Sequence, residues 1–388
     1  MTATWLDLKY PLDPSTDGLL RDLDDLLKGL GIPYLLTGAM AREILLHYGH
    51  GCNAGRKTTD VDFGVTVPSW EAYKNLLDSL EATGRFKRDP SQVQRMTHTN
   101  AQTGFRTSID LVPFGALAAS DGTLAWPPEG DHVMRILGYD QALDCAVQLK
   151  LGGDRSIPMA SALGLAILKL VAWLDRGKQT RGKDAVDFIE LLLRHGETLS
   201  EQELWDDYPE AMATYEQNQG PAAAWILGRR MSEHIDLSLR GIIQTIFQPE
   251  PRVLFLNHAL SDRWSLDPAA RATEAEIVLG AFEAGLNSHP TKSRLFERKR
   301  DMPASYEGDA LHGGKKVDGV NTIVGNLLER GAKMEELQKA LTDIGRRENA
   351  ARQHLTFLEK NGQRLFVNGE PYQKGHKINP GDWITLNS

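Results

Sequence analysis

The sequence predicts an α/β protein with a mixed sheet and flanking helices, a helical second domain and a small C-terminal α+β domain. Over residues 1–155, short apolar and β-branched runs alternate with segments of helical periodicity. Residues 156–285 are mainly helical in pattern. The chain has 388 residues, which exceeds one typical hydrophobic core, so two or three domains are expected.

The elements of the first domain, 1–155, follow in order along the chain. The pattern predicts a helix over residues 15–30, a strand over 33–37, a helix over 39–48, a strand over 59–67, a helix over 69–83, and strands near 93–98, 105–113 and 145–151. Ser69 is expected to cap the helix that begins at Trp70, because its hydroxyl can accept a hydrogen bond from a free backbone N–H.

The composition changes after the helical domain, 156–285. Residues 286–316 contain a basic run, 292–300, and several glycines, which indicates a linker. A separate module is expected over 317–388, with helices at 320–328, 334–341 and 349–358, an Asn368-Gly369 hairpin turn, and a strand at 383–386. Three helices and a hairpin resemble a winged helix, and the hairpin with Pro380-Gly381-Asp382 resembles the end of an RNA-binding S4 domain. A protein-docking or dimerisation module is the alternative.

Charge is distributed unevenly along the chain, whose net charge is −8. Residues 291–388 contain 17 Lys and Arg and 13 Asp and Glu, so they carry +4 and the part before them carries −12. Part of this acidity lies in the predicted first helix, at Asp17, Asp22, Asp24 and Asp25. An acidic helix surface favours solubility or a basic partner.

Two cysteines, Cys52 and Cys145, predict no disulfide framework. The N-terminus has neither the basic nor the apolar segment of a signal peptide. No apolar run approaches the roughly 20 residues of a membrane span. We therefore expect a cytoplasmic protein with no membrane partner.

Three carboxylates on two predicted strands indicate a metal site. Asp60 and Asp62 belong to the strand at 59–67, and Asp110 belongs to the strand at 105–113. Strand side chains alternate between faces, so Asp60 and Asp62 share a face, about 7 Å apart. Charges on a core-forming strand are costly unless they are paired or bind a metal. If the strands are neighbours, the three carboxylates converge on an oxygen-rich site suited to Mg²⁺. A solvent-facing Asp-x-Asp pair is the alternative.

A turn upstream of these strands predicts a phosphate site. Gly38-Ala39 joins the strand at 33–37 to the helix at 39–48. Glycine allows a tight turn, and the free N–H groups and dipole of a helix N-terminus attract anions. An ordinary strand-to-helix turn is the alternative.

A further pattern lies in the helical domain. Leu163–Arg176 is an apolar helix that carries one lysine, Lys169, and a basic turn then leads into Lys183-Asp184-Ala185-Val186-Asp187-Phe188. Together with Gly38-Ala39 and the three aspartates, this order of motifs resembles the AbiEii-type nucleotidyltransferases of the DNA polymerase β superfamily, which include toxins of toxin–antitoxin and phage-defence systems. The resemblance covers residues 17–240 and includes Trp126-Pro127-Pro128 and the segment 222–229. Ala39 stands where the superfamily usually has Gly or Ser, so a hydroxyl contact to phosphate is absent.

The resemblance implies a mechanism. Asp60 and Asp62 hold two Mg²⁺ ions, or Mn²⁺, one of them shared with Asp110, which is the expected base. Gly38, Ala39 and Arg42 bind phosphates, and Lys169 neutralises the triphosphate. Lys183 and Asp187 position the nucleotide.

Structural roles are the alternatives for several of these residues. Lys169 can extend from a buried helix to solvent. Lys183 and Asp187 can form an i,i+4 ion pair. Asp184 is expected to cap its helix or to pair with Arg181.

The implied function is Mg²⁺-dependent transfer of NMP from an NTP to an acceptor hydroxyl. RNA, at the tRNA 3′ end, is the expected acceptor, and an antitoxin protein is an expected partner. Adenylylation of a protein and nucleotidylation of a small molecule stay open, as does a non-catalytic nucleotide- or DNA-binding regulator. The sequence predicts neither the preferred NTP nor the oligomeric state.

Overall fold

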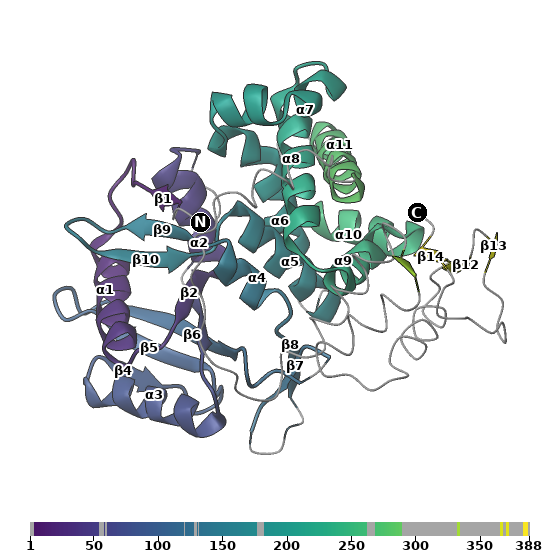
Figure 1. Ribbon diagram of the computed structural model, residues 1–388. Helices are drawn as coiled ribbons and strands as arrows, with labels where there is room; N and C mark the ends of the chain where they lie inside the picture. The colour runs from purple at the N-terminus through teal and green to yellow at the C-terminus, as the bar shows by residue number, and fades with distance from the viewer. Residues whose placement is uncertain are drawn as a thin grey trace. The chain divides into compact units, whose positions relative to one another are not determined.

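The computed structural model describes residues 4–53, 58, 60–119, 121–127, 130, 132–176, 182–261 and 268–288, and four short strands between 332 and 386. The chain divides into two compact units, Met1–Lys299 and Arg300–Ser388. The first unit contains the mixed sheet and the described helices (Figure 1). Every candidate site residue falls within its range.

An eight-stranded mixed sheet with the order β1-β9-β10-β2-β3-β6-β5-β4 forms the base of the first unit. Its strands are β1 (Trp5–Leu6), β2 (Tyr34–Thr37), β3 (Asp60–Thr66), β4 (Phe86–Arg88), β5 (Arg95–Thr99), β6 (Arg106–Phe114), β9 (Val147–Lys150) and β10 (Ser156–Met159). β3 lies between antiparallel β2 and parallel β6. A separate hairpin consists of β7 (Thr123–Ala125) and β8 (Val133–Arg135).

Two amphipathic helices, α1 (Pro14–Gly29) and α3 (Trp70–Ala82), pack beside the sheet (Figure 1). The predicted cap of α3 is confirmed, because Ser69 accepts a hydrogen bond from the Ala72 N–H at 3.1 Å. The buried Tyr73 hydroxyl donates to the Leu111 carbonyl at 2.8 Å, which fixes α3 against β6.

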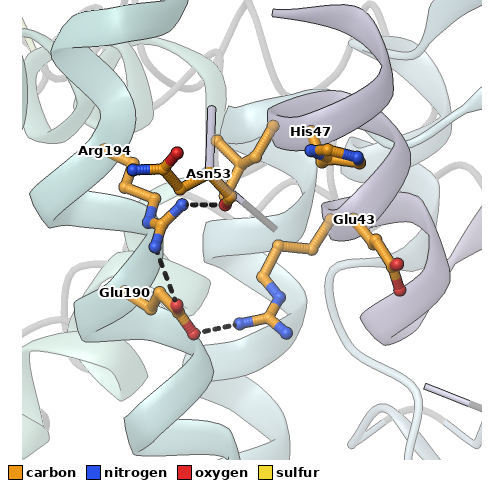
Figure 2. A pocket seen from close by; sticks show the side chains of 7 residues that line it. Glu43, His47, Asn53, Glu190 and Arg194 are labelled. Carbon is orange, nitrogen blue, oxygen red and sulfur yellow. Dashed lines mark hydrogen bonds and ion pairs between the residues drawn. The ribbon is translucent and has the colours of Figure 1, made fainter. Parts of the chain in front are cut away.

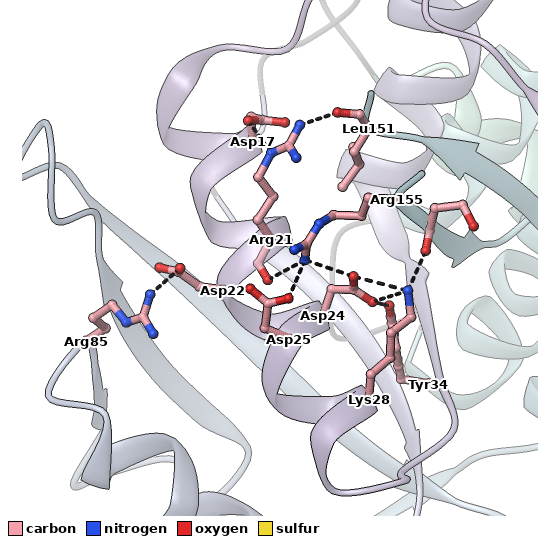
Figure 3. Close-up of polar contacts among 11 residues, drawn as sticks. Asp17, Arg21, Asp22, Asp24, Asp25, Lys28, Tyr34, Arg85, Leu151 and Arg155 are labelled. Carbon is pink, nitrogen blue, oxygen red and sulfur yellow. Dashed lines mark hydrogen bonds and ion pairs between the residues drawn. The ribbon is translucent and has the colours of Figure 1, made fainter. Parts of the chain in front are cut away.

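The acidic α1 is neutralised within the fold rather than left as an acidic surface. Arg155 donates to Asp24 at 3.0 Å and to Asp25 at 2.6 Å, and Tyr34 also donates to Asp24, which is 2% exposed (Figure 3). The remaining two acids of the helix, Asp17 and Asp22, pair with Arg21 and Arg85. A buried carboxylate is tolerated only when such partners offset its desolvation. The acids of α1 are therefore paired and Asp24 is buried, whereas the side chain of Asp25 remains 65% exposed.

The helices after the sheet pack around a close helix crossing. They are α5 (Ala162–Arg176), α6 (Lys183–Arg194), α7 (Pro209–Thr214), α8 (Gln219–His234), α9 (Leu237–Gln244), α10 (Pro249–Ala259) and α11 (Pro268–Asn287). A Cβ on Gly228 of α8 would lie 2.0 Å from the Phe282 carbonyl of α11, and a Cβ on Gly285 would lie 2.0 Å from the Trp225 carbonyl. The small residues of segment 222–229 therefore let α8 and α11 approach closely.

The second unit is described only by four strands. β12 (Leu365–Val367) and β13 (Glu370–Pro371) form an antiparallel hairpin, and β14 (Trp383–Leu386) lies between β12 and β11 (Ala332–Lys333). The predicted hairpin and the strand at 383–386 are confirmed. The predicted helices at 320–328, 334–341 and 349–358, and most of the predicted linker 286–316, lie outside the described residues. No helix of the described part is long and apolar enough to span a membrane.

Candidate active site

One face of the sheet carries the three predicted carboxylates. β3 and β6 are parallel neighbours, with Asp62 opposite Asp110 and Asp60 opposite Ser108. Val61 and Phe63 alternate with the aspartates and are 0% and 1% exposed on the opposite face. The strand pairing therefore brings Asp110 beside Asp62, although the two residues are far apart in the sequence.

The expected convergence of all three carboxylates is not seen in this arrangement. Within the described ranges, no group of three His, Cys, Asp or Glu side chains is placed to hold a metal ion. The carboxylate of Asp110 is bonded to Arg95 on β5, whose Nε and Nη2 donate to its two oxygens, each at 2.8 Å. The donor set, three carboxylates on one face, suits a hard divalent cation, and these residues would hold it.

Asp62 has the electrostatic character of a functional carboxylate. Burial raises its pKa from 3.8 to about 6, Lys169 opposes the rise, and the neighbouring charge of Asp110 adds to it. Arg176 and Lys183 also act to lower this pKa, so three cations lie within electrostatic reach of Asp62. A strongly perturbed acid close to a cluster of cations is typical of an active site.

Gly38 is required for the approach of the turn to Asp62. β2 pairs with β3 so that Thr37 lies opposite Asp62, and Gly38, the first residue of α2 (Gly38–Glu43), has a φ of +72°. A Cβ on Gly38 would lie 1.9 Å from Asp62 Oδ2. Thr37 makes no side-chain cap hydrogen bond, so the first N–H groups of α2, at Gly38 and Ala39, are not capped by that side chain.

Lys169 on α5 bonds to two acids of α6, and its charge also acts on Asp62. Its Nζ donates to Asp184 Oδ1 at 3.0 Å and to Asp187 Oδ2 at 2.6 Å. Burial works to lower the pKa of Lys169, but the charges of Asp187 and Asp184 outweigh burial and raise it. Lys169 is thus a buried, charged ammonium, and the alternative of a chain that extends to solvent is wrong.

Asp184 has two ion-pair partners other than the expected one. Besides Lys169, it forms an ion pair with Arg176 at 3.4 Å. Arg181, its expected partner, lies outside the described residues.

The ion pairs continue along α6 to α2. Arg42 Nη1 lies 3.2 Å from Asp187 and 2.6 Å from Glu190. Arg194 reaches both Glu190 and the Asn53 carbonyl, on the wall of a small pocket (Figure 2). Arg42 is 6% exposed, and its ion pairs with Asp187 and Glu190 join α2 to α6.

Lys183 and Asp187 do not behave as a simple pair. Asp187 bonds to Lys169 and Arg42, and their charges outweigh the opposing effect of burial and lower its pKa. Lys183 contributes a weaker lowering of the same pKa. Asp187 therefore links α5 and α2, and Lys183 acts on both Asp187 and Asp62 through its charge.

The sequence pattern missed two residues of this site. Arg95 is found only when the register of β5 against β6 is known, which places it opposite Asp110. Tyr139, at the start of α4 (Tyr139–Asp144), packs over Gly64, where a Cβ would lie 2.8 Å from its ring. Burial raises the pKa of Tyr139, and the charge of Asp62 adds to the rise.

The paired aspartates, the glycine turn and the buried lysine together define a nucleotidyltransferase. The chain belongs to the family described as "Nucleotidyl transferase AbiEii toxin, Type IV TA system", whose model matches residues 21–271. The predicted family is confirmed over this range, and the C-terminal module lies beyond it.

Known structures show weaker similarity. An antigenic nucleotidyltransferase-like protein from Paracoccidioides brasiliensis is 16% identical, with a TM-score of 0.33, over 61% of this chain and 95% of its own. The antibiotic-resistance factor ANT(2″)-Ia is 12% identical, with a TM-score of 0.28, over 57% of this chain and 96% of its own. The CdnC:HORMA-deltaN complex of E. coli MS115-1 matches at 12% identity and a TM-score of 0.22, over 65% of this chain and 91% of that one. No curated protein matches.

Proposed function

We propose that this protein transfers NMP from an NTP to an acceptor hydroxyl of RNA, at the 3′ end of tRNA, and that it requires Mg²⁺. One observation carries the proposal: Asp62 lies opposite Asp110 on the neighbouring strand and against the Gly38 turn, and the charge of Lys169 acts on its carboxylate. Carboxylates, free backbone N–H groups and a fixed cation are what a triphosphate and its metal ions need.

Each residue has a distinct role in this proposal. The N–H groups of Gly38 and Ala39 bind phosphate oxygens, and Lys169 offsets triphosphate charge. The oxygen of the acceptor forms a bond to the α-phosphorus, the bond to pyrophosphate breaks, and Asp110 takes the hydroxyl proton. Mg²⁺ or Mn²⁺ held by the three aspartates would supply electrostatic stabilisation of the phosphoryl oxygens.

Two further features support the proposed acceptor and the proposed partner. The family is one of toxins in toxin–antitoxin systems, which supports a toxic activity that an antitoxin protein opposes. Residues 291–388 carry a net +4, and their end resembles an S4 domain, which supports RNA as the acceptor.

The test is a transfer assay on the full chain. The protein is incubated with Mg²⁺, each α-³²P-labelled NTP and total tRNA, and Asp60→Asn is compared with Asp25→Asn. Asp25 belongs to α1, where it pairs with Arg155, so this variant controls for loss of one carboxylate. We expect labelled tRNA with the wild type and with Asp25→Asn, and none with Asp60→Asn.

Other outcomes separate the alternatives. Label on protein or on a small molecule, but not on tRNA, would retain the transferase and reject RNA as acceptor. Binding of NTP without any transfer would favour a regulator. Failure to bind NTP at all would reject the proposed function.

A further inference from the structure

Arg95 donates hydrogen bonds to both carboxylate oxygens of Asp110. It lies on β5 directly opposite Asp110 on β6, and its Nε and Nη2 each donate at 2.8 Å to a different oxygen of that residue. A guanidinium fork on a carboxylate is the strongest geometry of its kind, since two charge-assisted hydrogen bonds form in parallel. The side chains of Arg95 and Asp110 are 27% and 17% exposed.

The position of Arg95 makes it a counter-ion of the whole carboxylate face. Its hydrogen bonds to Asp110 raise its pKa, burial opposes the rise, and the charges of Asp110, Asp60 and Asp89 add to it. Asp110 therefore lies between another acid, Asp62, on β3 and a cation on β5. Arg95 therefore offsets part of the negative charge of this face from the β5 side of Asp110.

Arg95 and a divalent cation would compete for the carboxylate oxygens of Asp110. Metal coordination by Asp110 needs a carboxylate lone pair directed at an ion shared with Asp60 and Asp62, whereas the fork of Arg95 draws both oxygens toward β5. In the described part of the chain no three-carboxylate cluster is assembled, and both oxygens of Asp110 accept hydrogen bonds from Arg95. Arg95 is partly exposed, so its guanidinium can leave for solvent, within electrostatic reach of Asp89.

We propose that Arg95 is an internal cation that occupies Asp110 until a divalent cation and NTP displace it, so that it weakens the binding of metal alone. This inference rests on the proposed function, because it concerns the same carboxylates. Arg95 is a positioning residue that acts through Asp110. Because of it, assembly of the metal site depends on a divalent cation that arrives bound to the NTP.

The test measures metal affinity without turnover. Mn²⁺ is titrated into the full chain in the absence of NTP and followed by electron paramagnetic resonance. Arg95→Gln is compared with Arg252→Gln, since Arg252 is also a partly exposed arginine in an ion pair, with Glu276 of α11. We expect Arg95→Gln to bind Mn²⁺ about tenfold more tightly than the wild type, because one positive charge beside the site is removed. Arg252→Gln is expected to match the wild type.

A conservative variant covers the case in which Arg95→Gln does not fold. Arg95→Lys keeps the charge and loses the fork, so it is expected to bind Mn²⁺ more tightly than the wild type and more weakly than Arg95→Gln. Equal or weaker Mn²⁺ binding by both variants would overturn the inference, and Arg95 would then orient Asp110 for the metal. Absence of Mn²⁺ binding in Arg95→Gln as well as in the wild type, or Mn²⁺ binding by Arg95→Gln that Asp62→Asn leaves unchanged, would instead reject the proposed metal site.

Discussion

At the scale of single residues, the contact between Gly38 and Asp62 sets the geometry of the site. Gly38 combines a left-handed backbone with a neighbour only 1.9 Å from where a Cβ would be. The left-handed backbone and the close contact with Asp62 are two separate reasons for glycine at this position. Another glycine of the chain has only the first of them. Gly84 has a φ of +71° and nothing within 4 Å of its added Cβ.

We expect Gly38→Ala to lose both stability and activity. Gly84→Ala should cost about 1 kcal/mol from backbone strain alone. Gly38→Ala should cost more than this and lower transfer by about 100-fold or more, because the clash moves Asp62. Urea unfolding and the transfer assay measure the two effects. Equal loss of stability and activity in both variants would show that the contact with Asp62 is unimportant.

Lys169 is the second residue whose substitution should change the free energy of unfolding by a predictable amount. Lys169→Met leaves Asp187 and Asp184 with one cation each, Arg42 and Arg176, so we expect a loss of about 2 kcal/mol in the free energy of unfolding. Asp187→Asn in the same background should recover part of the loss, since a buried carboxylate is removed. Lys28→Met is the control, because Lys28 is 53% exposed and Asp24 keeps Arg155 as a partner. A loss as large in Lys28→Met would contradict this account.

At the scale of elements, α6 connects the parts of the site. Its residues Asp184, Asp187, Glu190 and Arg194 bond in turn to α5, α2 and the segment that precedes β3. The spacing of three or four residues places them along one side of the helix. α6 therefore aligns Lys169, the helix of the Gly38 turn and the chain entering the catalytic strand.

The end of α6 also carries a pH-dependent contribution to stability. Burial lowers the pKa of His195 from 6.5 to about 3, and the charge of Arg230 and the presence of His50 add to this, while Glu203 opposes it. The unfolded chain binds a proton near pH 6.5 and the folded chain does not, so stability falls as pH drops below 6.5. We expect a loss of about 2 kcal/mol between pH 7 and pH 5.

His195→Gln isolates this contribution. The variant should show a smaller loss of stability than the wild type on acidification, as measured by urea unfolding at pH 7 and pH 5. Identical pH dependence in the two proteins would mean that His195 is protonated equally in the folded and unfolded chains.

At the scale of the whole molecule, the candidate site and the net positive charge lie in different parts of the chain. Every candidate site residue lies in Met1–Lys299, whereas the net +4 belongs to residues 291–388, which begin with the basic run 292–300. We expect the truncated chain 1–290 to keep cooperative unfolding and NTP affinity, and to lose about tenfold or more in tRNA affinity, with a shallower salt dependence. Fluorescence anisotropy at two salt concentrations measures this. Unchanged tRNA affinity would exclude residues 291–388 as the RNA-binding part.

Local patterns in the sequence determined much of the fold and the identity of the acids. Apolar alternation predicted β2, β3, β5 and β6, and the turn at Gly38 was visible because glycine and helix-start signals are local. Short strands such as β1, β4 and β10 were not predicted, because a segment of two to four residues shows too little periodicity. β10 also contains a proline.

The sequence by itself thus determined the class of enzyme and its carboxylates, lysine and glycine, because those motifs are contiguous or closely spaced. Only the tertiary structure decided what each charge is bonded to. Arg95 on Asp110, Lys169 between Asp184 and Asp187, and Arg42 on Glu190 join strands and helices that are distant in the chain. Such pairings depend on register and helix packing, which no local pattern encodes.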